Sequence, residues 1–258
     1  MNKKEDYSKH ELLACILSRE LKDKTLGLVG ASALVPMAAC MLAQEFHAPN
    51  LTWISGGSGY VNPLPPLVVS SSAYRSRAEA VLPMERIFVM QGRSIDFFFA
   101  GAMQVDNIGR INLVGVGDPL QDKYSTRGPG SAGVSFASRS KRLFIYLKNH
   151  DKRIFVNKLD FVSGVPQKPL IVDEATKKTK NHILVSPLGV FEFAPPDQTM
   201  KIVSVHPGVT VQEVIDNTGF DVLGTLKKSE VPTTEEPTED ELEILRETVD
   251  PKKLLQRY

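Results

Sequence analysis

One stretch near residue 55 constrains the fold of this chain more than any other. It begins with the apolar run Leu51–Ile54 (LTWI) and then breaks into Ser55–Gly59 (SGGSG). This pattern predicts a buried strand that ends in a tight turn. Ligands of open α/β sheets bind just beyond the carboxyl ends of the strands, so we expect ligand contact or chemistry at the 55–59 corner. The alternative is a plain turn in which the glycines only supply positive φ angles.

The residues before this stretch complete a β–α–β pattern. A strand is predicted over Thr25–Val29 and a helix over Leu34–Phe46, where Pro36 is tolerated only in the first turn. This short spacing favours parallel strands joined by a right-handed crossover. We therefore expect an α/β fold with an open, mostly parallel sheet flanked by helices. Apolar residues at helical spacing predict a further amphipathic helix over Lys9–Lys22.

The rest of the chain alternates between apolar runs and turns. Further strands are predicted over Ile95–Val105, Ile111–Gly117, Leu143–Leu147, Ile154–Val162, Ile183–Val185, Val190–Phe193 and Ile202–Val205. Thr210 is expected to cap a helix over Val211–Asn217, and Thr238 opens a capping box before a helix over Thr238–Glu247. We expect one α/β domain over residues 1–228 and a linker with a docked C-terminal helix over residues 229–258.

Composition argues against several classes of protein. The net charge of +1 gives no general field that would attract nucleic acid or a membrane surface. The polar N-terminus lacks the apolar core of a signal peptide, no apolar run could span a membrane, and we expect a cytoplasmic protein. Cys15 and Cys40 lie in apolar segments, which predicts buried free thiols. The five histidines have no metal-ligand spacing, so no metal is expected.

Two short motifs match known patterns only in part. Gly128–Gly133 reads G-x-G-x-x-G, but the residues before it, Asp122–Arg127, do not form a buried strand, so we reject the dinucleotide-binding interpretation. A glycine-rich loop whose N–H groups approach a ligand stays open. Ser58 does not fit the nucleophile elbow G-x-S-x-G, because Tyr60 stands where the second glycine is needed.

Several motifs occur in the order found in one enzyme family. Gly101–Asp106 followed by Gly109–Asn112 resembles the signature G-A-x-Q-[VI]-D-x-x-G-N-x-N, with Arg110 in place of the asparagine. Further matching pieces are Gly27–Ser32, Lys152–Phe155, His206–Thr210 and Asn217–Phe220. Over about Leu12–Leu254 the chain resembles the β subunits of class I CoA-transferases of the glutaconate CoA-transferase type. The resemblance implies the fold of that family.

The resemblance also implies a type of chemistry. Class I transferases use a glutamate that attacks the acyl-CoA carbonyl and forms an anhydride and then an enzyme–CoA thioester. Ser55 stands at the position of this glutamate, and no glutamate occurs in Leu51–Pro63. The segment Phe191–Met200 is more similar to the β subunit of the ring-opening CoA hydrolase of bacterial steroid degradation, in which the α subunit supplies the glutamate. In a decarboxylase of the same fold, a cysteine takes this position.

The implied function is that of a β subunit of a heteromeric enzyme acting on acyl-CoA thioesters. We expect hydrolytic ring opening or thioester hydrolysis, with the glutamate supplied by an α subunit. The alternatives are CoA transfer with Glu79 or Glu85 as the glutamate, acyl-CoA decarboxylation, and a non-catalytic role in assembly. The implied partner is the α subunit, in a heterodimer or an α2β2 or larger assembly. The coenzyme A thioester is the substrate, and no cofactor is expected to be bound.

The expected site residues gather at the corner and in two glycine-containing segments. Ser55 occupies the catalytic position. Residues expected to bind the acyl group or CoA are Gly56, Gly57, Ser58, Gln104, Gly128, Gly130, Ser131 and Gly133. Backbone N–H groups of the corner are expected to help bind an oxyanion. Arg75, Arg77, Arg127 and Arg139 stay open as candidates for binding a carboxylate or the CoA phosphates.

Overall fold

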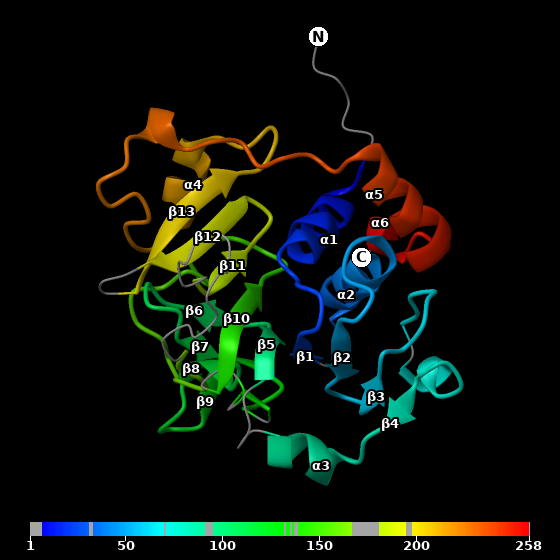
Figure 1. Cartoon of the computed structure of the whole chain (residues 1–258). Helices are drawn as coiled ribbons and strands as arrows, with labels where there is room; N and C mark the ends of the chain where they lie inside the picture. The colour runs from blue at the N-terminus through cyan, green and yellow to red at the C-terminus, as the bar shows by residue number, and fades with distance from the viewer. Residues whose placement is uncertain are drawn as a thin grey trace. The chain divides into compact units, whose positions relative to one another are not determined.

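The computed structural model describes residues 7–30, 33–69, 71–90, 95–131, 133–134, 136, 139–166, 181–194 and 198–257. They form two compact units, coloured by residue number in Figure 1. The first unit contains Met1–Val89 and Glu236–Tyr258, and the second contains Met90–Glu235. The C-terminal segment therefore belongs with the N-terminal part of the chain, whereas the single domain expected over residues 1–228 stays a prediction.

The first unit is built on the predicted β–α–β motif. β1 (Leu26–Val29) and β2 (Thr52–Ser55) pair in parallel, and α2 (Leu34–Phe46) connects them. β3 (Tyr60–Val61) and β4 (Ala80–Val81) extend the sheet as antiparallel strands. The remaining elements before residue 90 are α1 (Lys9–Arg19), η1 (Ser71–Tyr74) and α3 (Met84–Val89). The predicted bounds of α2 are confirmed, and α1 ends three residues earlier than predicted.

α2 is a core helix rather than a surface helix. Its residues Leu34–Ala43 are all buried, as expected for a helix that is apolar on every side. Pro36 lies in the first turn, where its missing N–H breaks no helical hydrogen bond. Cys15 and Cys40 are buried free thiols, as predicted. Burial raises the pKa of Cys15 to about 12 and raises the pKa of Cys40 well above its usual value, so neither thiol is reactive.

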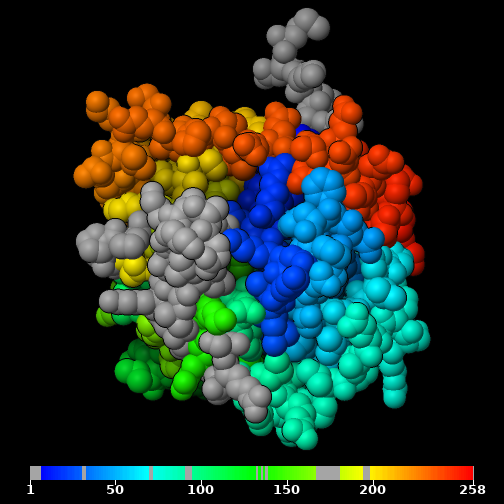
Figure 2. Space-filling view, in the orientation of Figure 1, coloured from blue at the N-terminus to red at the C-terminus, as the bar shows by residue number. Residues whose placement is uncertain are grey.

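The C-terminal segment forms three short helical pieces against the N-terminal helices. They are α5 (Glu239–Ile244), the π-helical turn η5 (Leu245–Val249) and α6 (Leu254–Arg257). Figure 2 shows this segment, in red, beside the blue N-terminal region, and contacts join α1 with α6 and α2 with α5. The capping box predicted at Thr238 is confirmed, with Glu241 as its acidic member.

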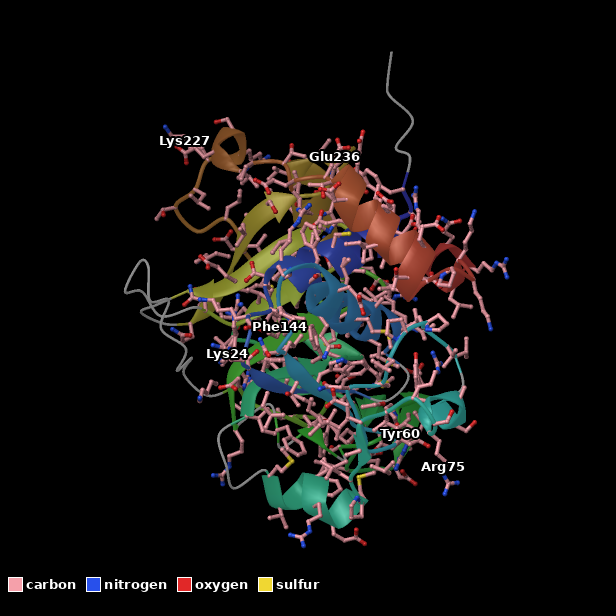
Figure 3. The ribbon with its side chains drawn as sticks, turned by 45° about the vertical axis from the view of Figure 1, so that its right-hand side comes forward. Lys24, Tyr60, Arg75, Phe144, Lys227 and Glu236 are labelled. Atoms are coloured by element: carbon pink, nitrogen blue, oxygen red, sulfur yellow. The ribbon has the colours of Figure 1, made fainter. Side chains whose placement is uncertain are left out.

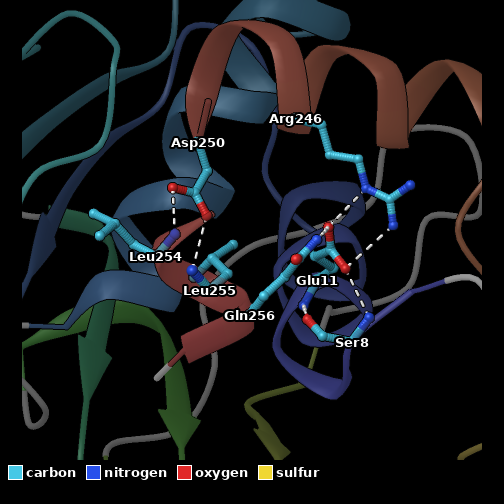
Figure 4. Close-up of polar contacts among 7 residues, drawn as sticks. All are labelled: Ser8, Glu11, Arg246, Asp250, Leu254, Leu255 and Gln256. Atoms are coloured by element: carbon cyan, nitrogen blue, oxygen red, sulfur yellow. Dashed lines mark hydrogen bonds and ion pairs between the residues drawn. The ribbon is translucent and has the colours of Figure 1, made fainter. Parts of the chain in front are cut away.

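Two partly buried ion pairs tie the C-terminal segment to α1. Glu11, which closes the capping box of α1, accepts hydrogen bonds from Arg246 at 2.8 and 3.3 Å (Figure 4). Glu241, which closes the capping box of α5, accepts hydrogen bonds from Arg19 at 2.7 and 2.6 Å. The first turn of each helix thus contains a glutamate that is paired with an arginine of the other segment. Burial alone would raise the pKa of Glu11, but the hydrogen bonds outweigh it and the pKa lies below its usual value.

The second unit has a sheet in the order β13-β12-β11-β10-β5. β5 (Ile95–Ala100), β10 (Ser140–Tyr146) and β11 (Ile183–Val185) are parallel, and β12 (Gly189–Ala194) and β13 (Thr199–Val205) are antiparallel. β6 (Gln104–Val105) pairs with β7 (Ile111–Asn112), and β8 (Gly115–Asp118) pairs with β9 (Lys123–Arg127). α4 (Val211–Asn217) is capped by Thr210 as predicted, and η4 covers Lys228–Glu230.

One predicted strand is divided in the structure. The run Ile95–Val105 breaks after β5, because Gly101 is exposed and the chain turns away from the sheet. The N–H of Met103 then donates to the backbone oxygen of Asn112 at 2.8 Å and begins the separate β6–β7 hairpin. The run Ile111–Gly117 is likewise divided between β7 and β8.

Another predicted strand, Ile154–Val162, is wrong. The N–H groups of Ile154 and Phe155 both donate to the backbone oxygen of Asp151, at 3.0 and 2.9 Å, which makes a turn. Phe155 is nevertheless fully buried. Phe155 follows this turn and forms an isolated bridge with Val105, so its buried side chain does not belong to an extended strand. No helix in the described part of the chain is long and apolar enough to cross a membrane.

Candidate functional site

The 55–59 corner lies where two parallel strands end together. Ser55 of β2 is in register with Val29 of β1, and the N–H of Gly56 donates to the backbone oxygen of Val29 at 2.8 Å. The N–H groups of Ser58 and Gly59 then both donate to the backbone oxygen of Ser55, at 3.2 and 2.7 Å. The predicted strand and tight turn are therefore confirmed.

Gly59 has a purely structural role in this corner. Its φ angle is +74°, and a Cβ atom at this position would lie 2.0 Å from the backbone oxygen of Leu82. The N–H of Leu82 donates to the backbone oxygen of Gly59 at 2.8 Å, so the segment that leads into α3 packs directly on the corner. The plain-turn interpretation therefore holds for this glycine.

Most backbone N–H groups of the corner are already used within the protein. Those of Gly56, Ser58 and Gly59 donate to backbone oxygens. Gly57 is exposed, and within the described ranges its N–H donates no hydrogen bond. Of the corner N–H groups named here, only that of Gly57 is therefore available to bind an oxyanion.

The two serine hydroxyls of the corner contact each other. Ser58 Oγ donates to Ser55 Oγ at 3.1 Å. Ser55 is only 4% exposed, whereas Ser58 is half-buried. In the part of the chain that the structure describes, no histidine or carboxylate forms a hydrogen bond with the Ser55 hydroxyl. Ser55 therefore lacks the base that would activate a serine as a nucleophile.

Two amide side chains that sequence reasoning missed hold the strand beneath the corner. Asn62 Oδ1 accepts from the backbone N–H of Trp53 at 2.8 Å, and Gln44 Oε1 accepts from the Trp53 ring nitrogen at 3.0 Å. Asn62 is buried and has a φ angle of +42°, in the left-handed region that asparagine tolerates. An asparagine directly after the strand–turn–strand pattern is the signal that could have identified it.

Gln104 lies in the second unit and is fully engaged with other side chains and backbone groups. Its Oε1 accepts from Asn112 Nδ2 at 2.8 Å and from the Asp160 N–H at 3.1 Å, and its Nε2 donates to Asp160 Oδ2 at 3.1 Å. Asp160 Oδ2 also accepts from the N–H of Gly117 at 2.9 Å. Gln104 thus joins the β6–β7 hairpin to β8 and to the loop around Asp160. Substrate contact by Gln104 stays a prediction.

Gly128 and Gly130 of the glycine-rich segment contact the residues that directly follow this hairpin. The N–H of Gly128 donates to the backbone oxygen of Val114 at 2.8 Å, and that of Gly130 to Leu113 at 2.9 Å. Ser131 is exposed. β9, which precedes the segment, is a mostly exposed strand, and this agrees with the rejection of a dinucleotide motif. The structure thus joins the predicted residues of the second unit to one another, while Ser55–Ser58 belong to the first.

Replacing Gly130 with alanine is expected to lower the free energy of unfolding by only about 1 kcal/mol. Its φ angle is +93°, but no atom of the described chain lies within 4 Å of the position of a Cβ atom. Urea denaturation followed by circular dichroism measures the change. Gly133→Ala is the matched control, since Gly133 has a φ of +78° and equally open surroundings. A loss of unfolding free energy above about 3 kcal/mol would show that the surroundings of Gly130 are not open. If Gly130→Ala raises the KM of the enzyme while its stability falls no more than expected, the loop contacts the substrate.

A buried hydrogen-bond chain in the second unit was also missed from sequence. His150 Nε2 donates to Thr218 Oγ1 at 3.0 Å, because that hydroxyl itself donates to a backbone oxygen, and His150 Nδ1 accepts from Ser186 Oγ at 2.8 Å. His206 Nε2 donates to the backbone oxygen of Ser186 at 2.8 Å. Ser186 is fully buried, so this serine–histidine pair cannot meet a substrate. Within the described ranges, no group of three or more His, Cys, Asp or Glu residues could hold a metal ion.

The four candidate arginines differ in how far they are engaged. Arg77 donates to two backbone oxygens of the loop over residues 64–66, both at 3.1 Å. Arg127 forms an ion pair with an exposed aspartate at 3.2 Å. Arg75 and Arg139 are exposed, and Figure 3 shows Arg75 projecting outward from the region of η1. Binding of a carboxylate or phosphate by any of them stays a prediction.

Comparison with known proteins gives sequence matches that include residues of both compact units. The family model described as coenzyme A transferase matches residues 11–217. The cholesterol ring-cleaving hydrolase IpdB subunit of Mycobacterium bovis is 32% identical over 237 residues, which cover 90% of this chain and 91% of that protein. The B-type subunit of 3-oxoadipate CoA-transferase from Pseudomonas knackmussii is 31% identical over 259 residues, 93% of this chain and 92% of that protein.

A solved structure matches the whole architecture. The crystal structure of Rhodococcus jostii RHA1 IpdAB aligns with a TM-score of 0.78 and 28% sequence identity, and the alignment covers 98% of each chain. Together with the parallel strands and flanking helices described above, this match confirms the predicted α/β fold of the CoA-transferase type.

Proposed function

Because the chain belongs to the coenzyme A transferase family, we propose that it is the β subunit of a heteromeric enzyme acting on acyl-CoA thioesters. Within that class we propose a hydrolytic reaction, either ring opening of the acyl group or cleavage of the thioester, with the nucleophilic glutamate supplied by an α subunit. The thioester is the substrate and no further cofactor takes part. Such a substrate fits a cytoplasmic enzyme, and we propose that location and an α2β2 or larger assembly.

The serine at the corner is the observation that carries this proposal. The family resemblance expects a glutamate at position 55, and this chain has Ser55 with no glutamate from Leu51 to Pro63. Ser55 is buried, and in the described part of the chain its hydroxyl forms a hydrogen bond only with the Ser58 hydroxyl. A nucleophile or base must therefore come from elsewhere. The similarity to a ring-cleaving hydrolase subunit agrees with a partner as its source.

The corner has a defined role in this proposal. An acyl group placed beyond the ends of β1 and β2 meets small residues, which leave space for its carbonyl carbon. When water or a carboxylate attacks that carbon, negative charge develops on the carbonyl oxygen. The donors nearest to this position are the exposed N–H of Gly57 and the corner hydroxyls. This chain then contributes electrostatic stabilisation, and its partner contributes the attacking group or base.

CoA transfer between carboxylic acids is the second candidate. The similarity to the B-type subunit of 3-oxoadipate CoA-transferase favours it. Transfer needs a glutamate that can form the acyl anhydride. Glu79 and Glu85 are both exposed, and Glu79 accepts a hydrogen bond from Asn62 Nδ2 at 3.0 Å. In the described ranges, neither glutamate forms a hydrogen bond with Ser55. Decarboxylation or a purely assembling role would follow only if neither transfer nor hydrolysis occurs.

The test uses this chain co-expressed and purified with its α-type subunit. The complex is given a panel of acyl-CoA thioesters in ¹⁸O-labelled water, with and without acetate, and products are followed by mass spectrometry. We expect a hydrolysed or ring-opened product that carries ¹⁸O and forms equally well without acetate. The chain alone, without its partner, is the control and is expected to give no turnover.

Three results would overturn the proposal. Acetyl-CoA that forms only when acetate is present would establish transfer, and a glutamate outside the corner would then carry the reaction. Turnover by an α subunit without this chain would leave it a role in assembly only. Loss of carbon dioxide from the acyl group would instead establish decarboxylation.

A further inference from the structure

The hydroxyl pair at the corner has an inner and an outer member. Ser55 is 4% exposed and lies at the end of β2, whereas Ser58 is half-buried and lies in the turn above it. The two oxygens are 3.1 Å apart, with Ser58 as the donor. A ligand that approaches the corner therefore meets the Ser58 hydroxyl before it can reach that of Ser55.

We propose that Ser58 is the side chain that contacts the oxygen of the substrate carbonyl group under attack, and that Ser55 acts through Ser58 as a positioning residue. This assignment rests on the proposed function and deepens it. It reverses the order that the family resemblance implies, in which position 55 holds the group that touches the substrate. The reversal follows from burial and from the direction of the hydrogen bond.

The pair can change its hydrogen bonds without transferring a proton. A serine hydroxyl has one donor hydrogen and two acceptor lone pairs, and it rotates to suit its surroundings. When a carbonyl oxygen becomes negatively charged above the corner, the Ser58 hydroxyl turns outward and donates to it. The Ser55 hydroxyl then turns and donates to Ser58 Oγ across the same 3.1 Å. Hydrogen bonds in such a chain polarise one another, so the inner serine strengthens the outer donor.

The backbone of the corner fits this arrangement. The N–H groups of Ser58 and Gly59 both donate to the backbone oxygen of Ser55, which fixes the turn that holds Ser58 over Ser55. The Gly57 N–H, beside Ser58 in the sequence, is exposed and makes no hydrogen bond within the described ranges. Ser58 is thus the hydroxyl next to the available backbone donor, whereas Ser55 is shielded.

A double-mutant cycle on the purified complex tests the assignment. The variants are Ser58→Ala, Ser55→Ala and the double variant, assayed with the thioester that the wild-type complex turns over fastest. Ser58→Ala is expected to lower kcat/KM by about 30-fold, below the range for a rigid oxyanion donor because a hydroxyl rotates. Ser55→Ala is expected to lower it by about 5-fold. The double variant is expected to match Ser58→Ala within about 2-fold, because Ser55 has no effect without Ser58.

Three further measurements separate this role from a merely structural one. Ser58→Thr keeps a hydroxyl and is expected to restore activity to within about 3-fold of wild type. The loss in Ser58→Ala is expected in kcat with little change in KM, as for an interaction made only in the transition state. Urea midpoints and the elution volume of the complex are expected to stay unchanged in all variants.

The outcomes are distinguishable from a failure of the proposed function. The inference is overturned, while hydrolysis stands, if the effects of the two alanine substitutions on kcat/KM multiply in the double variant. It is also overturned if Ser55→Ala lowers kcat/KM more than Ser58→Ala does. If the wild-type complex turns over no thioester, binding of the ketone analogue S-acetonyl-CoA by calorimetry replaces kcat/KM. The assignment is supported if Ser58→Ala binds the analogue more weakly than wild type does and the double variant binds it as tightly as Ser58→Ala. Equal affinity of wild type and Ser58→Ala overturns it.

Discussion

Replacing Arg246 with alanine is expected to lower the free energy of unfolding of the first unit by about 3 kcal/mol. Glu11, its partner, has a side chain that is only 3% exposed, and its carboxylate would stay charged and buried without the arginine. Arg246 itself is 28% exposed, so we place the loss at the low end of the range for breaking a buried pair. Hydrogen bonds from Ser8 at 2.7 Å and Gln256 at 3.3 Å would compensate only in part.

The chain offers its own reporter for this measurement. Trp53 is the single tryptophan, it is fully buried, and it belongs to the same unit as Glu11. Urea denaturation followed by Trp53 fluorescence therefore gives the stability of that unit. The control is the double variant Glu11→Gln, Arg246→Ala, which removes the buried charge as well as its partner and is expected to recover about half of the loss. A cost for Arg246→Ala below about 0.5 kcal/mol would mean that the pair behaves as an ordinary surface ion pair.

The second ion pair of the C-terminal segment, between Glu241 and Arg19, shows which contacts can be predicted from the sequence and which cannot. The pattern Thr238–Glu241 predicts a helix start correctly, because a capping box is local chemistry between residues three apart. The same glutamate also pairs with Arg19, more than 200 residues away in the sequence. The sequence alone does not identify Arg19 as the partner, since charged residues are common on helix surfaces. The helix could be predicted, and the contact that docks it could not.

The strands show a second limit. β2 and the corner after it were predictable, because an apolar run followed by glycine and serine has few alternatives. The runs Ile95–Val105 and Ile154–Val162 were assigned as strands because apolar residues indicate burial. Burial does not determine the path of the backbone. Phe155 is fully buried, yet it follows a turn and forms an isolated bridge, and β5 ends at Ala100 although apolar residues continue beyond it.

The candidate site shows a third limit, which concerns polar residues. The position of Ser55 could be predicted from the pattern and the family resemblance. The burial that separates Ser55 from Ser58 required coordinates, because two hydroxyls three residues apart look equivalent in a sequence. Asp160 and Asn62 escaped notice for the same reason. Their roles consist of hydrogen bonds to groups that lie between 9 and 56 residues away in the chain.

Lowering the pH from 7.5 to 5 is expected to remove about 2 kcal/mol of stability through His150 alone. Burial lowers the pKa of His150 to about 3, with a further contribution from His206 and opposition from Asp151. In the unfolded chain the pKa is near 6.5. Between these two values the unfolded chain binds a proton at His150 and the folded chain does not. Stability therefore falls as the pH drops through 6.5, by about 1.4 kcal/mol per unit, until the folded protein also titrates.

The structure gives the reason why His150 resists protonation. Its Nδ1 already accepts from Ser186 Oγ at 2.8 Å, and its Nε2 donates to Thr218 Oγ1 at 3.0 Å. A proton on Nδ1 would place a positive charge in this buried site, and Ser186 Oγ would have to rotate and donate to the backbone oxygen of Gly189 instead. The measurement is urea denaturation followed by far-UV circular dichroism at pH 7.5 and pH 5. His150→Gln, which does not titrate, is expected to be less stable at pH 7.5 but to lose about 2 kcal/mol less than wild type on acidification. An equal pH dependence in both proteins would show that His150 is protonated in the folded state near its ordinary pKa, and the buried hydrogen-bond chain would then have to open at neutral pH.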